Sequence, residues 1–97
     1  MKKISFIWDE TKAEENRKKH KIAFEEALTV FADTKARMIF DPEHSDDEDR
    51  FVILGISSEL RLLVVCHCYR EDDMLIRIIS ARKATKQEYK QYGNFLL

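Results

Sequence analysis

The stretch RFVILGISSELRLLVVCHCYREDDMLIRIISA, residues 50–81, contains three runs that are rich in Ile, Val and Leu. The runs cover residues 50–57, 60–69 and 74–81, and this composition is typical of buried β-strands. Connections of two and four residues join them, and connections this short link antiparallel neighbours. The stretch therefore predicts an antiparallel sheet of at least three strands.

The residues before this sheet predict a short strand and two helices. Residues 4–8 are β-prone, and Asp9 follows them as an N-cap for a helix that runs to about His20. A second amphipathic helix is predicted by apolar residues at the spacing of a helical face: Phe24, Ala27, Leu28 and Phe31.

A short strand is also expected at residues 37–40, and a last helix begins after Thr85, which has the spacing of a capping box with Glu88. Between them, residues 41–50 carry six acidic residues against one arginine and predict an exposed loop. The order indicates one α+β domain over residues 1–97. In it, two N-terminal helices and a C-terminal helix pack on one face of a four- to five-stranded, largely antiparallel sheet.

Length and composition limit the function classes. The 97 residues are 44% hydrophobic and 36% charged, which is enough apolar material for one folded domain. We expect a soluble cytoplasmic protein, because no apolar run approaches the length of a membrane span. The sequence contains no phosphate-binding loop, nucleophile elbow or zinc-protease motif. Cys66 and Cys68 are expected to be structural thiols, because no further ligands at a zinc-site spacing accompany them.

Basic residues on the predicted strands are the remaining candidates for chemistry. A turn centred in the second connection places Arg61 opposite Arg82, and a register one residue longer pairs His67 with Arg77 and Arg61 with Lys83. Like charges that face each other on a sheet are destabilising unless an anion lies between them. Either register therefore indicates a basic cluster suited to a phosphate.

Each of these residues also has a purely structural explanation. An arginine on a sheet face is commonly solvated or paired with an acid. His67 lies within an apolar run, where a hydrogen-bonded core histidine is common, and His20 is placed to stabilise a helix C-terminus. Trp8 is expected to anchor the core.

Several blocks along the chain together resemble the BrnT toxins of bacterial type II toxin-antitoxin systems. The resemblance covers about residues 6 to 92. It is carried by these blocks: Phe6-Ile-Trp8-Asp9-x-x-Lys12, Asn16-x-x-Lys19-His20, Phe24-Glu25-Glu26-Ala27, Val30-Phe31-x-Asp33, Asp41-Pro-x-His44-Ser45, Arg50-Phe51, Gly55-x-Ser57 and Ile78-Ile79-Ser80-Ala81-Arg82-x-Ala84-Thr85-x-x-Glu88-x-x-x-Tyr92.

This resemblance implies a RelE-like fold and a ribonuclease that cleaves RNA and arrests growth. It further implies a BrnA antitoxin whose ribbon-helix-helix part binds the promoter of the operon, so that promoter DNA is reached only through the antitoxin. One departure concerns Lys21-Ile22-Ala23, where the family commonly has Gly-Val-Ser. The change removes an easy left-handed helix end and an N-cap, at about 1 kcal/mol each.

A ribonuclease of this kind needs no metal or other cofactor if the RNA 2′-hydroxyl is the nucleophile and side chains stabilise the phosphorane and move the protons. Arg61 and Arg82 are expected at the phosphate and Arg77 at the substrate, with His67 or His20 as acid or base. The residues so assigned are Arg61, His67, Arg77 and Arg82 as catalytic residues and Lys19, His20 and Lys83 as RNA contacts.

The same basic surface would also serve a non-catalytic module that binds nucleic acid or protein. Incubation with RNA in EDTA separates the two functions, because only the enzyme cleaves the strand, and a purely structural partner protein would neither bind nor cleave. We also expect the antitoxin to cover the strand cluster and residues 77–90. The acidic loop should stay outside the interface or else meet a basic region of the antitoxin.

Overall fold

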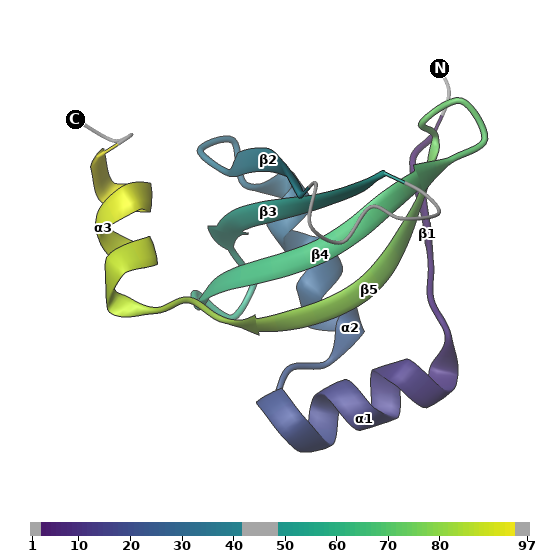
Figure 1. The fold of residues 1–97 in the computed structure, drawn as a ribbon, viewed down its shortest axis with the longest axis horizontal. Helices are drawn as coiled ribbons and strands as arrows, with labels where there is room; N and C mark the ends of the chain where they lie inside the picture. The colour runs from purple at the N-terminus through teal and green to yellow at the C-terminus, as the bar shows by residue number, and fades with distance from the viewer. Residues whose placement is uncertain (1–2, 42–48, 95–97) are drawn as a thin grey trace.

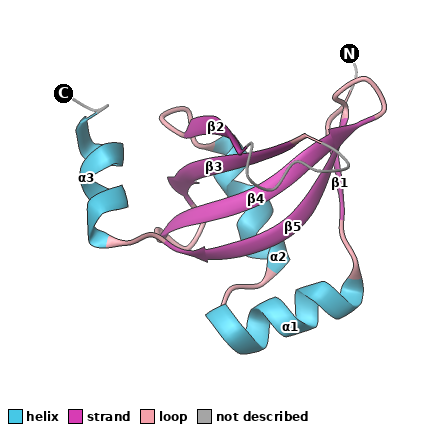
Figure 2. Cartoon of the chain, viewed as in Figure 1, coloured by secondary structure: helices cyan, strands magenta, loops and turns pink. Residues whose placement is uncertain are grey.

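The protein is described here by a computed structural model that covers residues 3–41 and 49–94. Figures 1 and 2 show its helices and strands. In chain order they are β1 (Ser5–Ile7), α1 (Glu10–His20), α2 (Phe24–Ala27), the 3₁₀ helix η1 (Leu28–Ala32), β2 (Arg37–Asp41), β3 (Arg50–Ile56), β4 (Leu62–Arg70), β5 (Leu75–Lys83) and α3 (Lys86–Asn94). The predicted elements are therefore confirmed with small shifts at their ends. Most of the predicted acidic loop, residues 42–48, lies outside the described residues.

The sheet has five strands in the order β1-β5-β4-β3-β2. β2, β3, β4 and β5 pair with their neighbours in antiparallel fashion, as the short connections predict, and β1 joins the far side of β5 in parallel. The parallel pair is compatible with the chain because β1 and β5 are far apart in sequence, with α1, α2, η1 and the other three strands between them. The prediction of a largely antiparallel sheet is confirmed.

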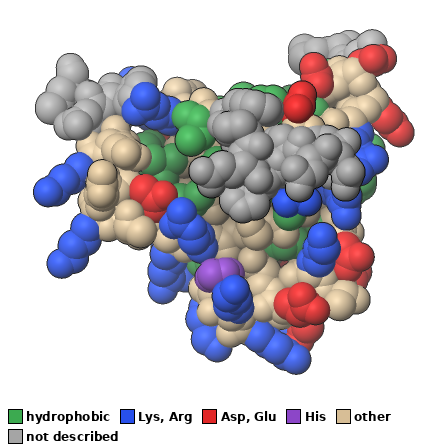
Figure 3. All heavy atoms as spheres, in the orientation of Figure 1, with side chains coloured by type: hydrophobic (Ala, Val, Ile, Leu, Met, Phe, Trp, Pro, Cys, Tyr) green, Lys and Arg blue, Asp and Glu red, His purple; other side chains and the backbone are tan. Residues whose placement is uncertain are grey.

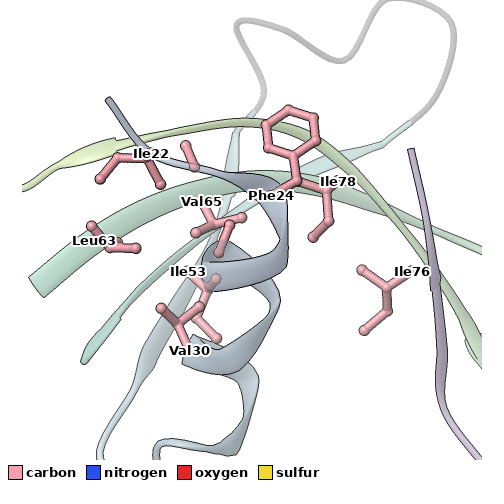
Figure 4. Packing of buried hydrophobic residues seen from close by; sticks show 10 residues of the cluster. Ile22, Phe24, Val30, Ile53, Leu63, Val65, Ile76 and Ile78 are labelled. Atoms are coloured by element: carbon pink, nitrogen blue, oxygen red, sulfur yellow. The ribbon is translucent and has the colours of Figure 1, made fainter. Parts of the chain in front are cut away.

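The main core lies between the sheet and the N-terminal helices (Figure 4). Phe24, Ala27 and Val30 are fully buried at intervals of three residues. The predicted second helix continues as the 3₁₀ helix η1, in which three residues complete a turn. Residues three apart therefore face the same core. The sheet contributes buried residues from its three inner strands to the same cluster: Ile53, Leu63, Val65, Ile76 and Ile78.

The C-terminal helix packs on the other face of the sheet, which corrects the prediction that all helices share one face. Tyr92 of α3 forms a second cluster with Leu54, Leu62 and Val64. Successive side chains of a strand point to opposite faces, so Val64 lies on the face opposite to Leu63 and Val65. In Figure 1, α3 stands at the end of the sheet where β5 terminates. Among the residues that the structure describes, no helix covers the middle of this second face.

The ends of α1 agree with the sequence. The Asp9 carboxylate accepts a hydrogen bond from the Lys12 backbone N–H at 3.1 Å, which confirms the N-cap. Lys21 has a φ of 62° after the last turn, so a lysine occupies a left-handed position that favours glycine. Ala23 precedes α2 without a side-chain cap. The structure therefore has a non-glycine residue at the left-handed end of α1 and no side-chain N-cap on α2, as the departure from Gly-Val-Ser predicts.

A Lys21→Gly variant should be more stable than the parent protein. Glycine adopts the left-handed conformation without a Cβ penalty, so we expect the free energy of unfolding to rise by about 0.5–1 kcal/mol. Urea denaturation measures the change, and Lys18→Gly, within α1, provides the opposite control because glycine weakens a helix interior. A Lys21→Gly variant that is less stable than the parent would contradict the argument.

Candidate nucleic-acid interface

A β-bulge in β5 determines which basic residues share a face. Cys66 of β4 pairs with Ser80 and the next residue, His67, pairs with Ile78, so Ile79 is an extra residue in β5. Without this extra residue, the odd-numbered Arg77 and the even-numbered Arg82 would point to opposite faces. With it, both lie on the same face of the sheet.

Both registers predicted from the turn are wrong. Arg82 lies opposite Val64 and Arg77 lies opposite Cys68, so neither faces Arg61 or His67. The turn accounts for part of the shift because Glu71, Asp72 and Asp73 all have positive φ, which makes it wider than a two-residue hairpin turn. The bulge then adds a second shift along the strand.

The face that carries Arg77 and Arg82 is the one without the N-terminal helices, because Val64 belongs to the second hydrophobic cluster. Two arginines that the sequence reasoning did not select as site residues lie on the same face. Arg50 shares a face with Val52, two residues along β3, and Val52 pairs with Cys66 on the face of Val64. Arg37 pairs with Leu54, which lies on the same face. The alternation of Arg50, Val52 and Leu54 is the sequence signal that could have placed them there.

A shallow hollow of about 300 Å³ lies on this sheet face. Its polar walls come from three strands and from the end of α1, and its floor is apolar. The residues that line it are His20, Arg50, Val52, Val64, Cys66, Ile79, Ser80, Ala81 and Arg82. We call it the arginine hollow. In the space-filling view, one histidine lies among several Lys and Arg side chains (Figure 3).

Asn16 holds the end of α1 beside the arginine hollow. Its buried amide donates hydrogen bonds to the carbonyl oxygens of Ile22 at 3.0 Å and Ala81 at 2.9 Å, and its Oδ1 accepts from the Ala81 N–H at 3.0 Å. The side chain thus completes the backbone pairing of β5 from the helix. This contact fixes His20 next to the strand that carries Arg82.

A second hollow of about 220 Å³ adjoins the first and shares Val52 and Val64 with it. Its other walls come from β2, β3 and α3: Arg37, Ile39, Leu54, Glu88 and Gln91. We call it the helix hollow. The two hollows are therefore neighbours, with Arg82 lining the first and Glu88 the second.

Arg82 and Glu88 form a bidentate ion pair between the two hollows. Arg82 Nη1 and Nη2 donate to the two carboxylate oxygens of Glu88 at 2.8 and 3.0 Å. Glu88 also accepts from the Thr85 N–H at 2.8 Å and donates its own N–H to Thr85 Oγ1 at 3.2 Å, which confirms the predicted capping box. The Arg82 guanidinium lowers the pKa of Glu88 to about 2, while the pKa of Arg82 is raised by the same contact.

Arg61 and Lys83 lie away from the arginine hollow. Arg61 donates from Nε to Glu26 Oε2 at 2.9 Å and from Nη2 to the other carboxylate oxygen, and Ser57 Oγ donates to the same carboxylate at 2.6 Å. The bond to Arg61 lowers the pKa of Glu26 despite its partial burial. Lys83 pairs with Leu63 of the main core and therefore points to the helix side. The structure does not bring Arg61 and Arg82 together.

His67 lies in the core on the helix side of β4. It is fully buried, and its ring packs against Phe31, Phe51 and Tyr69, with centroid separations of 4.8, 6.2 and 5.2 Å. The ring nitrogens contact the Val65 carbonyl oxygen at 3.2 Å and Tyr69 Oη at 3.4 Å. His67 is thus separated from Arg82 by the sheet itself, and burial lowers its pKa.

The buried His67 should make stability depend on pH. Its folded pKa lies below the unfolded value of 6.5, so the unfolded state binds the proton first as the pH falls. The contribution of His67 to stability is complete above pH 6.5 and is lost below it, by at most about 1.4 kcal/mol per pH unit. Urea denaturation at pH 7.5, 6.5 and 5.5 should show this decline in the parent protein and in His20→Gln, but a flatter profile in His67→Leu. An unchanged slope in His67→Leu would assign the dependence to other groups.

The remaining predicted residues are on or near the surface. Lys19 is exposed on α1. Neither Cys66 nor Cys68 forms a disulfide. Only Cys68 is buried, while the half-buried Cys66 lines the arginine hollow, which corrects the expectation of two buried thiols. Within residues 3–41 and 49–94, no three His, Cys, Asp or Glu side chains gather as metal ligands would. No helix in this part of the chain is long and apolar enough to span a membrane.

Comparisons with known proteins agree with this architecture. A family model described as the ribonuclease toxin BrnT of type II toxin-antitoxin systems matches residues 8–88. Among solved structures, the crystal structure of the Brucella abortus ribonuclease toxin BrnT matches with 24% sequence identity and a TM-score of 0.64. The alignment covers 86% of this chain and 99% of that one. No curated protein sequence matches significantly.

Proposed function

This chain belongs to the BrnT family of ribonuclease toxins of type II toxin-antitoxin systems, and we propose that it cleaves RNA in the arginine hollow. The observation that carries this assignment is the bulge at Ile79, which gives Arg77 and Arg82 a common face. Their partners on β4 are four residues apart, roughly 13 Å along the strand. An RNA strand that lies along the face meets both guanidinium groups.

The chemistry we propose uses the RNA 2′-hydroxyl as the nucleophile. It attacks the adjacent phosphorus, forms a cyclic phosphate and releases the 5′-hydroxyl of the next nucleotide, so one proton leaves the 2′-oxygen and one reaches the leaving oxygen. Arg82 stabilises the negative charge that develops on the phosphorane, because guanidinium groups bind phosphate oxygens in pairs. His20 is the imidazole that lines the hollow and is our candidate for a proton transfer.

The other predicted residues contact RNA outside the cleaved bond or take no part. Arg77 and Lys19 hold the RNA backbone on either side of the cleaved bond, and Arg50 joins them from β3. Arg61 and Lys83 lie on the helix side of the sheet. If they contact RNA, they bind nucleotides other than those in the arginine hollow. His67 takes no part in this chemistry, because no surface of its ring is accessible.

The test is an RNA cleavage assay on the purified protein in excess EDTA. We expect strand scission with 2′,3′-cyclic phosphate ends and no requirement for Mg²⁺ or another cofactor, because the nucleophile belongs to the substrate. Activity that is lost on chelation and restored by a divalent ion would contradict the metal-free mechanism. Retarded but intact RNA in every condition would favour the alternative function, a non-catalytic binding module.

A type II toxin implies a protein antitoxin as its partner. We propose a BrnA-type antitoxin with a ribbon-helix-helix part, which inhibits growth arrest by covering the arginine hollow and is the only link to promoter DNA. We propose that the protein acts in the cytoplasm, where its RNA substrate is found. We also propose that its fold is RelE-like. Hydrogen exchange of the complex should protect β4 and β5, and protection limited to other elements would argue for inhibition at a distance.

A further inference from the structure

The bonds of Arg82 occupy one end of its guanidinium group. Nη1 and Nη2 both donate to Glu88, and Nη1 also donates to the Lys83 carbonyl oxygen at 3.2 Å. A guanidinium group has five N–H donors. Within the described part of the chain, the Nε–H and one Nη2–H of Arg82 have no acceptor. These two groups lie side by side along one edge of the plane and form a fork that matches two oxygens of a phosphate.

Arg82 and its partner Glu88 line different hollows. Glu88 lines the helix hollow, whereas Arg82 lines the arginine hollow. The carboxylate therefore holds the guanidinium from the side of α3. The side chain of Arg82 remains 42% exposed despite the ion pair, so an incoming anion can reach it without breaking the bond to Glu88.

Glu88 is itself fixed by its surroundings. Thr85 binds both its carboxylate and its backbone N–H in the capping box. The helix that carries it is anchored by Tyr92, whose hydroxyl donates to Asp33 Oδ2 at 2.7 Å, and Asp33 also accepts from the Ile56 N–H at 2.8 Å. With a pKa of about 2, the Glu88 carboxylate stays ionised under working conditions. It acts as a rigid support for a flexible arginine.

We propose that Glu88 is a positioning residue that orients Arg82, so that the Nε and Nη2 fork receives the phosphate group of RNA. This inference rests on the proposed ribonuclease function and adds a residue that does not contact RNA. A guanidinium held in advance loses less conformational freedom when phosphate binds and is aligned with the developing charge. Without Glu88 the same positive charge would be present, but its donors would be spread over many rotamers.

The decisive variant is Glu88→Gln, because glutamine retains the size of the side chain and can still serve in a capping box. Its neutral amide cannot accept from Nη1 and Nη2 together, as the two oxygens of an ionised carboxylate do. We expect kcat for RNA cleavage to fall 10- to 100-fold, with a smaller change in KM, because misplaced catalytic groups affect the transition state most. The matched control is Glu25→Gln, the same substitution at an exposed glutamate of α2, which should retain activity within about threefold.

Further measurements separate this inference from the proposed function. Arg82→Lys retains the charge and lacks the fork, so it should lose activity similarly, and adding Glu88→Gln to it should have little further effect. Binding of non-cleavable 2′-O-methyl RNA reports on positioning even if the parent protein does not cleave RNA, an outcome that would overturn the proposed function alone. In that assay Glu88→Gln should bind more weakly. Unchanged or faster cleavage by Glu88→Gln, unchanged binding, or full activity of Arg82→Lys would overturn the positioning role.

Discussion

An Arg82→Ala variant should lose RNA cleavage by at least about 100-fold, which is the largest effect on activity that we expect from a single substitution. Loss of one preorganised donor to the transition state typically costs about 3 kcal/mol in the barrier, which corresponds to this factor. The substitution removes no core residue, because the guanidinium lies between two surface hollows. The initial rate of cleavage of a labelled RNA in EDTA measures the loss.

The control for Arg82→Ala is Arg17→Ala, which removes an equally charged side chain from the exposed face of α1. Among the described residues, the Arg17 side chain binds only Glu14, so its removal should change the rate less than about threefold. Circular dichroism must show that each variant is folded. Arg61→Ala provides a sharper comparison, because the sequence assigns it the same role whereas the structure places it beside Glu26. If folded Arg61→Ala and Arg82→Ala lose the same amount of RNA cleavage activity, Arg61 also belongs to the active site.

An Asn16→Leu variant should lose about 3 kcal/mol of the free energy of unfolding, the largest effect on stability that we expect. Leucine has a similar volume but leaves the buried carbonyl groups of Ile22 and Ala81 and the N–H of Ala81 without their partners. Each buried polar group that loses its partner costs roughly 1–3 kcal/mol, although relaxation recovers part of this. Urea denaturation monitored by tryptophan fluorescence measures the change, with the m-value as a check on two-state unfolding.

Lys19→Ala is the matched control for Asn16→Leu, because Lys19 lies on the same helix with its side chain exposed. Exposed substitutions of this kind usually change stability by less than about 0.5 kcal/mol. A similar stability for both variants would show that the Asn16 hydrogen bonds are replaced by water. Asn16→Leu also distinguishes the roles of His20 and Arg82. The position of His20 beside β5 depends on the Asn16 hydrogen bonds, whereas Arg82 is part of β5 itself.

Features that depend on neighbouring residues could be predicted from the sequence. The Asp9 cap and the capping box of Thr85 and Glu88 involve residues three positions apart, and both are present in the structure. The left-handed Lys21 follows from the same local reasoning. The antiparallel order of β3, β4 and β5 follows from connections that are too short for any other arrangement.

Features that depend on distant parts of the chain could not be predicted in this way. β4 is apolar on both faces from Leu62 to Val65, so alternation does not reveal which side the following His67 faces. The sequence pattern places Asn16 on a polar face of the helix. Its hydrogen bonds to the backbone of Ala81 join residues that are 65 positions apart, so no local pattern predicts them. The membership of the arginine hollow depends on register, which a single wide turn and one bulge are enough to change.

The bulge at Ile79 has a consequence for the comparison of this chain with its relatives. Arg77 and Arg82 can be retained in a related sequence while the chain between them gains or loses one residue. Such an alignment would score both arginines as identical, yet one of them would be turned through the sheet into the hydrophobic core. In this region the number of residues between the arginines is as informative as their identity, and a single-residue gap should be counted as a change in the site.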